Sequence, residues 1–120
     1  MLVGSLAEGE IVLIDWRGDG LRQEPNKLRP CVVVEDHGLF EESFPNVLIV
    51  PLADDSSYLI PSLCVRIEPT PENGCTKPCF AVSHSITVAS KHRIARLTSS
   101  RIDREQLNAI RAQIAICIGL

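Results

Sequence analysis

Charged side chains that could act on a phosphate group lie at the ends of two apolar segments. Arg29 precedes the segment 30–35 (PCVVVE), and Asp54 and Asp55 follow the segment 47–52 (VLIVPL). A guanidinium presents several donors in a planar fork that suits phosphate oxygens, and a carboxylate can orient that fork or accept a proton. Loop charges are more often simply solvated, so their positions alone favour a passive role.

His84 is a further candidate for proton transfer, because imidazole titrates near neutral pH. It lies between Ser83 and Ser85 in the segment 80–88 (FAVSHSITV). A histidine inside a strand is more often structural, and this alternative stays open.

The cysteines predict reduced thiols that are mostly buried. They are odd in number, and three of them lie in apolar runs, where a free thiol behaves as a small hydrophobe; the five are Cys31, Cys64, Cys75, Cys79 and Cys117. Cys75 and Cys79 (CTKPC) could bind zinc or form a bridge, but no second close pair follows them. The acidic pair after residue 52 also lacks a third ligand at a recognisable spacing. We therefore expect neither a metal nor another cofactor.

Length and composition predict one domain spanning residues 1–120. The net charge is −3 and 45% of the residues are apolar, which supports a packed core but not the positive field of a general nucleic-acid binder. Any RNA site must therefore be local. The chain shows neither a signal-peptide pattern nor an apolar run long enough to cross a bilayer, so we expect a cytoplasmic protein without a membrane partner.

Five short apolar segments are expected to form strands with no long helix between them, which favours a small antiparallel barrel. They are residues 11–16, 30–35, 47–52, 63–68 and 80–88, and residues 92–96 could add a sixth. The polar segment 17–29 carries two glycines and a proline and is predicted to be a long surface loop.

The C-terminal segment predicts one amphipathic helix. Asp103 can cap its start, Gln106 can reach back to the cap, and Ile102 can pack on Leu107, which together form a capping box with a hydrophobic staple. Apolar residues recur from Leu107 to Ile118 at steps of three and four. The closing IAICIGL is expected to be buried helix.

Four segments in this order, GEIVLIDW, LRPCVVV, NVLIVPL and REQLNAIRAQIAICIGL, resemble the MazF/PemK family of toxin endoribonucleases along nearly the whole chain. The resemblance implies an SH3-like barrel with a C-terminal helix (CcdB/MazF-like), and a homodimer whose two clefts bind single-stranded RNA. It implies cleavage by 2′-hydroxyl attack without a metal. It also implies a cognate antitoxin, with operator DNA bound only through the toxin–antitoxin complex.

The family's RP motif falls on Arg29 and Pro30, so the resemblance implies that Arg29 contacts the scissile phosphate. The family's second catalytic group, a Thr or Ser hydroxyl, falls on Ala53. Losing one such donor typically costs about a hundredfold in rate. Three explanations remain: a naturally weak member, replacement of the hydroxyl by Asp54, Ser56 or Ser57, or an engineered change that silences a toxic nuclease. The last is favoured, because the rest of the site is intact.

Some relatives place a catalytic Asp and Arg on the strand that holds Ser83 and Ala81 here. His84 could compensate, and Ser83 is expected to lie at the substrate. The long loop would overhang the cleft and could read bases or grip phosphates; its candidate residues are Arg17, Gln23, Asn26 and Lys27.

Two other functions compete with RNA cleavage. A non-catalytic toxin on the same fold, like the gyrase poison CcdB, would fit Ala53, although CcdB-type proteins act through C-terminal residues that are expected to be buried here. A DNA-binding regulator is less favoured, because the sequence shows no helix-turn-helix and no basic face.

Overall fold

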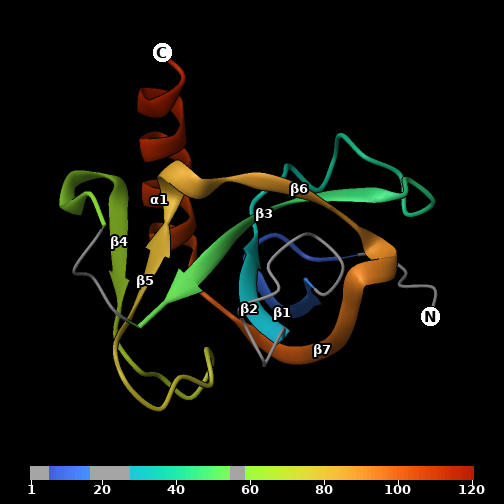
Figure 1. The fold of residues 1–120 in the computed structure, drawn as a ribbon, viewed down its shortest axis with the longest axis horizontal. Helices are drawn as coiled ribbons and strands as arrows, with labels where there is room; N and C mark the ends of the chain where they lie inside the picture. The colour runs from blue at the N-terminus through green and yellow to red at the C-terminus, as the bar shows by residue number, and fades with distance from the viewer. Residues whose placement is uncertain (1–5, 17–27, 55–58) are drawn as a thin grey trace.

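The computed structural model describes residues 6–16, 28–54 and 59–120. In this part of the chain, seven strands form one curved antiparallel sheet and a single α-helix follows them (Figure 1). The strands are β1 (Glu10–Asp15), β2 (Leu28–Val33), β3 (Asn46–Ala53), β4 (Cys64–Ile67), β5 (Cys79–Val82), β6 (Thr87–Ser90) and β7 (Ile94–Arg101); the helix is α1 (Arg104–Cys117); and the 3₁₀ turns are η1 (Pro61–Leu63), η2 (Ser83–Ser85) and η3 (Lys91–Arg93).

The strand order is β4-β5-β3-β2-β1-β7, and β6 also pairs with β3. β3 is long enough to pair with β6 along its first half and with β5 at its end. The chain turns at η2 between these two partners, so β4 and β5 diverge toward α1 (Figure 1). The predicted class, mainly β with a C-terminal helix, is confirmed. The sheet is not closed in the described residues, because β4, β6 and β7 each pair with one neighbour only.

Two predicted strand boundaries are wrong. Segment 80–88 is not one strand, because η2 separates β5 from β6. Segment 92–96 begins with η3, which Ser90 caps by accepting a hydrogen bond from the backbone N–H of His92 at 3.2 Å. The strand that follows, β7, extends to Arg101. Its polar, largely exposed second half gave no apolar alternation to detect.

The central strands separate two apolar clusters, which explains their continuous runs of β-branched residues. Val12, Cys31 and Val33 belong to one cluster, and Ile11 and Val32 belong to the other. Successive side chains of a strand point to opposite faces, and here both faces are covered. A segment such as CVVV is therefore apolar at every position.

Helix α1 covers the second cluster, and its start agrees with the prediction. The side chain of Asp103 accepts from the backbone N–H of Gln106 at 2.7 Å, and the side chain of Gln106 accepts from the backbone N–H of Asp103 at 3.0 Å. Ile102 and Leu107 are buried in the same cluster, as a hydrophobic staple requires. Arg111 then joins the helix to the sheet by donating to the carbonyl of Val34 at 3.0 Å.

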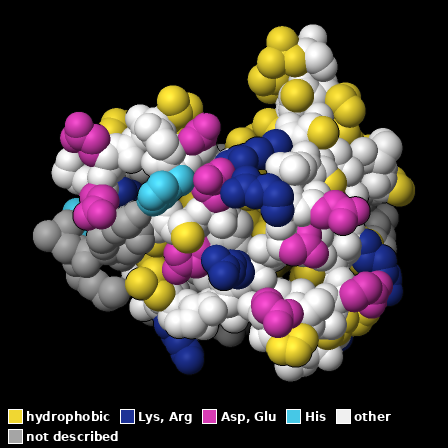
Figure 2. Space-filling view, turned by 180° about the vertical axis from the view of Figure 1, so that it is seen from behind, with side chains coloured by type: hydrophobic (Ala, Val, Ile, Leu, Met, Phe, Trp, Pro, Cys, Tyr) yellow, Lys and Arg dark blue, Asp and Glu magenta, His cyan; other side chains and the backbone are white. Residues whose placement is uncertain are grey.

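The end of α1 is exposed, so the prediction of a buried tail is wrong. Ile116, Ile118 and Leu120 are 61%, 66% and 86% exposed. The helix projects past the sheet (Figure 1), and apolar side chains gather on the projecting end (Figure 2).

The prediction of mostly buried thiols is also wrong. All five cysteines are free, but only Cys31 is buried, and Cys117 is exposed on this projecting end. No helix in the described segments is long and apolar enough to span a membrane.

Candidate active site

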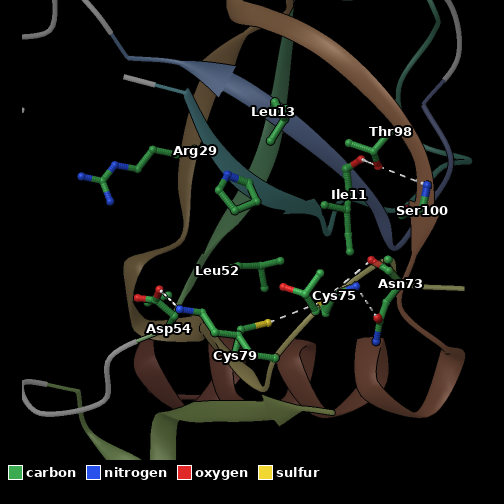
Figure 3. A pocket seen from close by; sticks show the side chains of 15 residues that line it. Ile11, Leu13, Arg29, Leu52, Asp54, Asn73, Cys75, Cys79, Thr98 and Ser100 are labelled. Carbon is green, nitrogen blue, oxygen red and sulfur yellow. Dashed lines mark hydrogen bonds and ion pairs between the residues drawn. The ribbon is translucent and has the colours of Figure 1, made fainter. Parts of the chain in front are cut away.

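A cavity of about 470 Å³ opens between the ends of the central strands, β7 and the loop that joins β4 to β5 (Figure 3). Its floor is apolar and its rim is polar or charged. The apolar side chains include Ile11, Leu13 and Leu52; the polar side chains are Arg29, Asp54, Asn73, Thr76, Lys77, Thr98 and Ser100. An apolar floor beneath a few charged groups is typical of ligand sites.

The antiparallel register brings Arg29 and Ala53 to this cavity. Cys31 of β2 pairs with Pro51 of β3, and continuing that register by two residues sets the start of β2 beside the end of β3. Arg29, Pro30 and Ala53 accordingly line the same cavity. The Arg29 side chain extends outward from the apolar floor (Figure 3). Its guanidinium therefore lies at the rim.

Asp54 pairs with a residue that the sequence did not suggest. Its Oδ2 lies 2.9 Å from Nζ of Lys77, and both side chains are well exposed. The hydrogen bond from Lys77 and the positive charge of Lys77 lower the pKa of Asp54. A carboxylate with a lowered pKa is a weaker base, so this geometry favours an orienting role for Asp54 over proton abstraction. Because solvent screens exposed pairs, this one adds little to stability.

Asn73 fixes the loop that carries Lys77. Its buried side chain accepts hydrogen bonds from the backbone N–H groups of Thr70 at 3.0 Å and of Cys75 at 2.9 Å, and it donates to the carbonyl of Glu68 at 2.8 Å. The next residue, Gly74, has φ +66°, and a Cβ there would lie 2.7 Å from Oγ of Ser100 on β7. A side chain at this position would therefore both strain the turn and push it off β7.

Cys75 and Cys79 also line the cavity, with their Sγ atoms 3.8 Å apart. Burial raises the pKa of Cys79 to about 12, and the proximity of Cys75 adds to that increase. In the described residues, no three His, Cys, Asp or Glu side chains gather as a metal site would need.

Ser83 and His84 do not line this cavity. Ser83 is fully buried, and its hydroxyl donates to Oε1 of Gln113 on α1 at 2.6 Å. Nε2 of His84 is buried and has no hydrogen-bond partner among the described residues. Their expected parts in substrate binding and cleavage stay predictions. The structure does not bring either residue to Arg29.

The expected loop contacts fall outside the described residues. They are Arg17, Gln23, Asn26 and Lys27, and the same holds for Asp55, Ser56 and Ser57. The polar cavity residues that sequence reasoning missed are Asn73, Thr76, Lys77, Thr98 and Ser100. No sequence signal marked Thr98 and Ser100, because Ser99 between them is also polar and its φ of +63° interrupts the regular period of the strand.

A curved antiparallel sheet, one capped helix and a cavity rim that carries Arg29 and Lys77 define a small, mainly β protein with a candidate site for an anionic ligand. Residues 7–118 match the family described as PemK-like, MazF-like toxin of type II toxin–antitoxin system. This chain belongs to that family.

Solved structures show the same fold at low sequence identity. MazF from Deinococcus radiodurans superposes with a TM-score of 0.74 at 10% identity, covering 97% of this chain and 98% of that one. Toxin MazF-mt6 from Mycobacterium tuberculosis gives 0.70 at 16% identity, covering 92% and 97%. A mycobacterial endoribonuclease in complex with its cognate antitoxin gives 0.68 at 14% identity, covering 98% and 97%. A search of curated proteins finds no match.

Proposed function

We propose that this chain is the toxin of a type II toxin–antitoxin system and a sequence-specific, metal-independent endoribonuclease acting on single-stranded RNA. The observation that carries the proposal is the shared cavity. Arg29 and Ala53 stand where the family is expected to have its arginine and its hydroxyl, and both line this cavity although they belong to different strands. A structural neighbour described as an endoribonuclease supports the proposal.

The proposed reaction needs little more than a positioned phosphate. The 2′-oxygen of RNA loses its proton and attacks the adjacent phosphorus, the bond from phosphorus to the 5′-oxygen breaks, and a cyclic phosphate and a 5′-hydroxyl remain. The guanidinium of Arg29 would stabilise the charge that develops on the phosphorane oxygens. Lys77 offers a second cation at the rim, and Asp54 orients it.

Ala53 weakens this reaction in the chain as it stands. Its methyl group lines the cavity but cannot donate a hydrogen bond to the phosphorane. Missing one preorganised donor lowers the rate by about a hundredfold or more. We therefore propose a form whose binding site is retained and whose catalysis is impaired.

The test restores the hydroxyl. Cleavage of a mixed RNA pool is compared for the unchanged chain, the Ala53→Thr variant and the Ala53→Val variant, and the product ends are mapped. Valine matches the shape of threonine without its hydroxyl. We expect the Ala53→Thr variant to cleave about a hundredfold faster, at a defined sequence, leaving cyclic phosphate ends. Equal rates for the two variants would refute the proposal.

The proposed partners are a second copy of this chain, a cognate antitoxin and single-stranded RNA, with operator DNA engaged only through the toxin–antitoxin complex. Neighbours described as MazE–MazF from Deinococcus radiodurans and as an endoribonuclease with its cognate antitoxin support the antitoxin. The exposed apolar end of α1 supports a protein partner of some kind. Action on cellular RNA would take place in the cytoplasm.

A CcdB-like mode of action is not favoured. The argument from a buried C-terminus no longer applies, because Ile116 and Ile118 are exposed. The family match favours an RNA-cleaving toxin over a CcdB-like one, since it covers nearly the whole chain and describes a PemK-like, MazF-like toxin.

A further inference from the structure

The thiols of Cys75 and Cys79 form a pair in the cavity wall that the proposed cleavage reaction does not use. Their Sγ atoms are 3.8 Å apart, and both side chains are half-buried. Both line the cavity together with Asp54 (Figure 3), and Lys77 lines it as well. Two thiols in contact at a site open to solutes can exchange with a dissolved disulfide.

The backbone on both sides of the Cys75–Cys79 contact is held in place by hydrogen bonds. The N–H of Cys75 donates to Oδ1 of Asn73 at 2.9 Å, and the Asn73 side chain is itself buried. Cys79 begins β5 and pairs with Ile67 of β4. A disulfide needs its sulfurs at about 2.05 Å. The two sulfurs must therefore approach each other from 3.8 Å when the bridge forms between these anchors.

We propose that Cys75 and Cys79 are a reversible dithiol–disulfide site that takes low-molecular-weight disulfides, and that its oxidation weakens the hold of the cavity on RNA. The thiolate of Cys75 attacks one sulfur of the small disulfide and expels the other as a thiolate. Cys79 then gives up its proton and attacks the Cys75 sulfur, which releases the second small thiolate. Two protein thiols are oxidised and one small disulfide is reduced to two thiols.

Cys75 is the first nucleophile because burial holds the pKa of Cys79 at about 12, so that Cys79 stays protonated. The proximity of Cys75 is the next cause of that raised pKa. A mixed disulfide on Cys75 cannot ionise, so this contribution is absent once the first step is complete. The first step therefore prepares the second.

Lys77 lies inside the ring that the bridge closes. Its Nζ pairs with Asp54 at 2.9 Å, and the reach of this cation toward a bound phosphate depends on the conformation of the loop. A five-residue ring restricts that conformation. This consequence for RNA rests on the proposed function, whereas formation of the disulfide does not.

The test uses the full-length Cys117→Ser variant, which lacks the exposed competing thiol. The protein is equilibrated with glutathione disulfide, alkylated and digested with trypsin. The bond from Lys77 to Pro78 resists trypsin, so the peptide 67–91 carries Cys75 and Cys79 and no other cysteine. We expect this peptide to lose about 2 Da, to escape alkylation, and to recover both thiols after reduction.

A matched control adds Cys79→Ser, which should leave a glutathione mixed disulfide on Cys75 instead. Two alkylated thiols in peptide 67–91 of the Cys117→Ser protein, or a lasting mixed disulfide there, would overturn the site. Binding of a labelled single-stranded 2′-deoxy oligonucleotide is then measured for both redox states. We expect binding several-fold weaker after oxidation. Equal binding in the two redox states overturns only the proposed effect of oxidation on RNA binding, and the disulfide site stands. Absence of binding in both states counts against the proposed function.

Discussion

Two regions of this toxin carry residue types suited to RNA cleavage, but one is open to solvent and the other is buried. At the cavity, Arg29 and Lys77 reach a rim that is open to solvent. At η2, the hydroxyl of Ser83 is fully buried and bonded to Gln113. Gln113 also donates to the carbonyl of Cys64 at 3.2 Å. The charged groups of the first region lie at a rim open to solvent, whereas the polar groups of the second hold α1 against the sheet.

The difference shows that residue type alone does not identify a site. A buried hydroxyl that hydrogen-bonds to a neighbouring element contributes to the stability of the fold. A cation at the rim, above an apolar floor, can bind a phosphate. Changes to the substrate and substitutions in each region test this division.

The strongest effect is expected from the substrate. With the Ala53→Thr variant, replacing the ribose at the cleaved position by 2′-deoxyribose removes the attacking oxygen. Cleavage at that position should fall below detection while binding persists. The measurement is gel analysis of matched oligonucleotides. Continued cleavage of the deoxy substrate would mean that water or another group attacks the phosphorus. The proposed attack by the 2′-oxygen would then be refuted.

Ser83→Ala is expected to lower the free energy of unfolding by about 1–3 kcal/mol, because Gln113 loses its buried partner. Denaturant melts of the Ser83→Ala variant and the unchanged chain measure this loss. Ser85→Ala is a matched control, since Ser85 is an exposed neighbour in the same turn. A stable Ser83→Ala protein would remove the structural role assigned to this hydroxyl.

Lys77→Gln is expected to weaken binding of single-stranded RNA and to make it less sensitive to salt. Losing one phosphate contact should reduce the slope of log affinity against log salt by about 0.7. Lys91→Gln serves as the control, because Lys91 lies away from the cavity, where its Nζ donates to the carbonyl of Glu42 at 3.0 Å. Unchanged slopes for both variants would mean that Lys77 does not contact phosphate, and the proposed contact would then be made by Arg29.

The smallest expected effect is on titration of Asp54. Lys77 lowers the pKa of this carboxyl, so Lys77→Gln should raise it toward its ordinary value. The pair stabilises the fold above the unfolded pKa, and that contribution is lost as pH falls through the lowered pKa; both groups are exposed, so stability should hardly change. NMR titration of the side-chain carbonyl carbon measures the shift. An unmoved pKa would mean that the two groups do not pair in solution.

Much of the fold could be predicted from sequence, because local signals agreed with packing. The continuous apolar run at Val32 and Val33 marked strands that are buried on both faces, and Asp103 with Gln106 marked the start of the helix. The apolar pattern of segment 80–88 gave no sign of the turn at Ser83. The projecting end of α1 was missed because exposure depends on what lies nearby, which apolar periodicity does not report.

The site was predictable to the extent that strand register determines it. An antiparallel pair brings the start of β2 to the end of β3, so Arg29 and Ala53 could be expected to meet. Lys77 could not be placed in this way. The path of its loop depends on hydrogen bonds to Asn73 and on the left-handed backbone of Gly74, which spacing along the sequence does not reveal.

We infer that RNA is cleaved at the cavity and that the residues of η2 serve stability. In the Ala53→Thr background, cleavage rates of one single-stranded RNA are compared for Arg29→Ala and Ser83→Ala at a temperature where both variants are folded. We predict that Arg29→Ala lowers the rate by about a hundredfold or more and that Ser83→Ala leaves it within about threefold of the parent. A large loss with Ser83→Ala and none with Arg29→Ala would contradict the account.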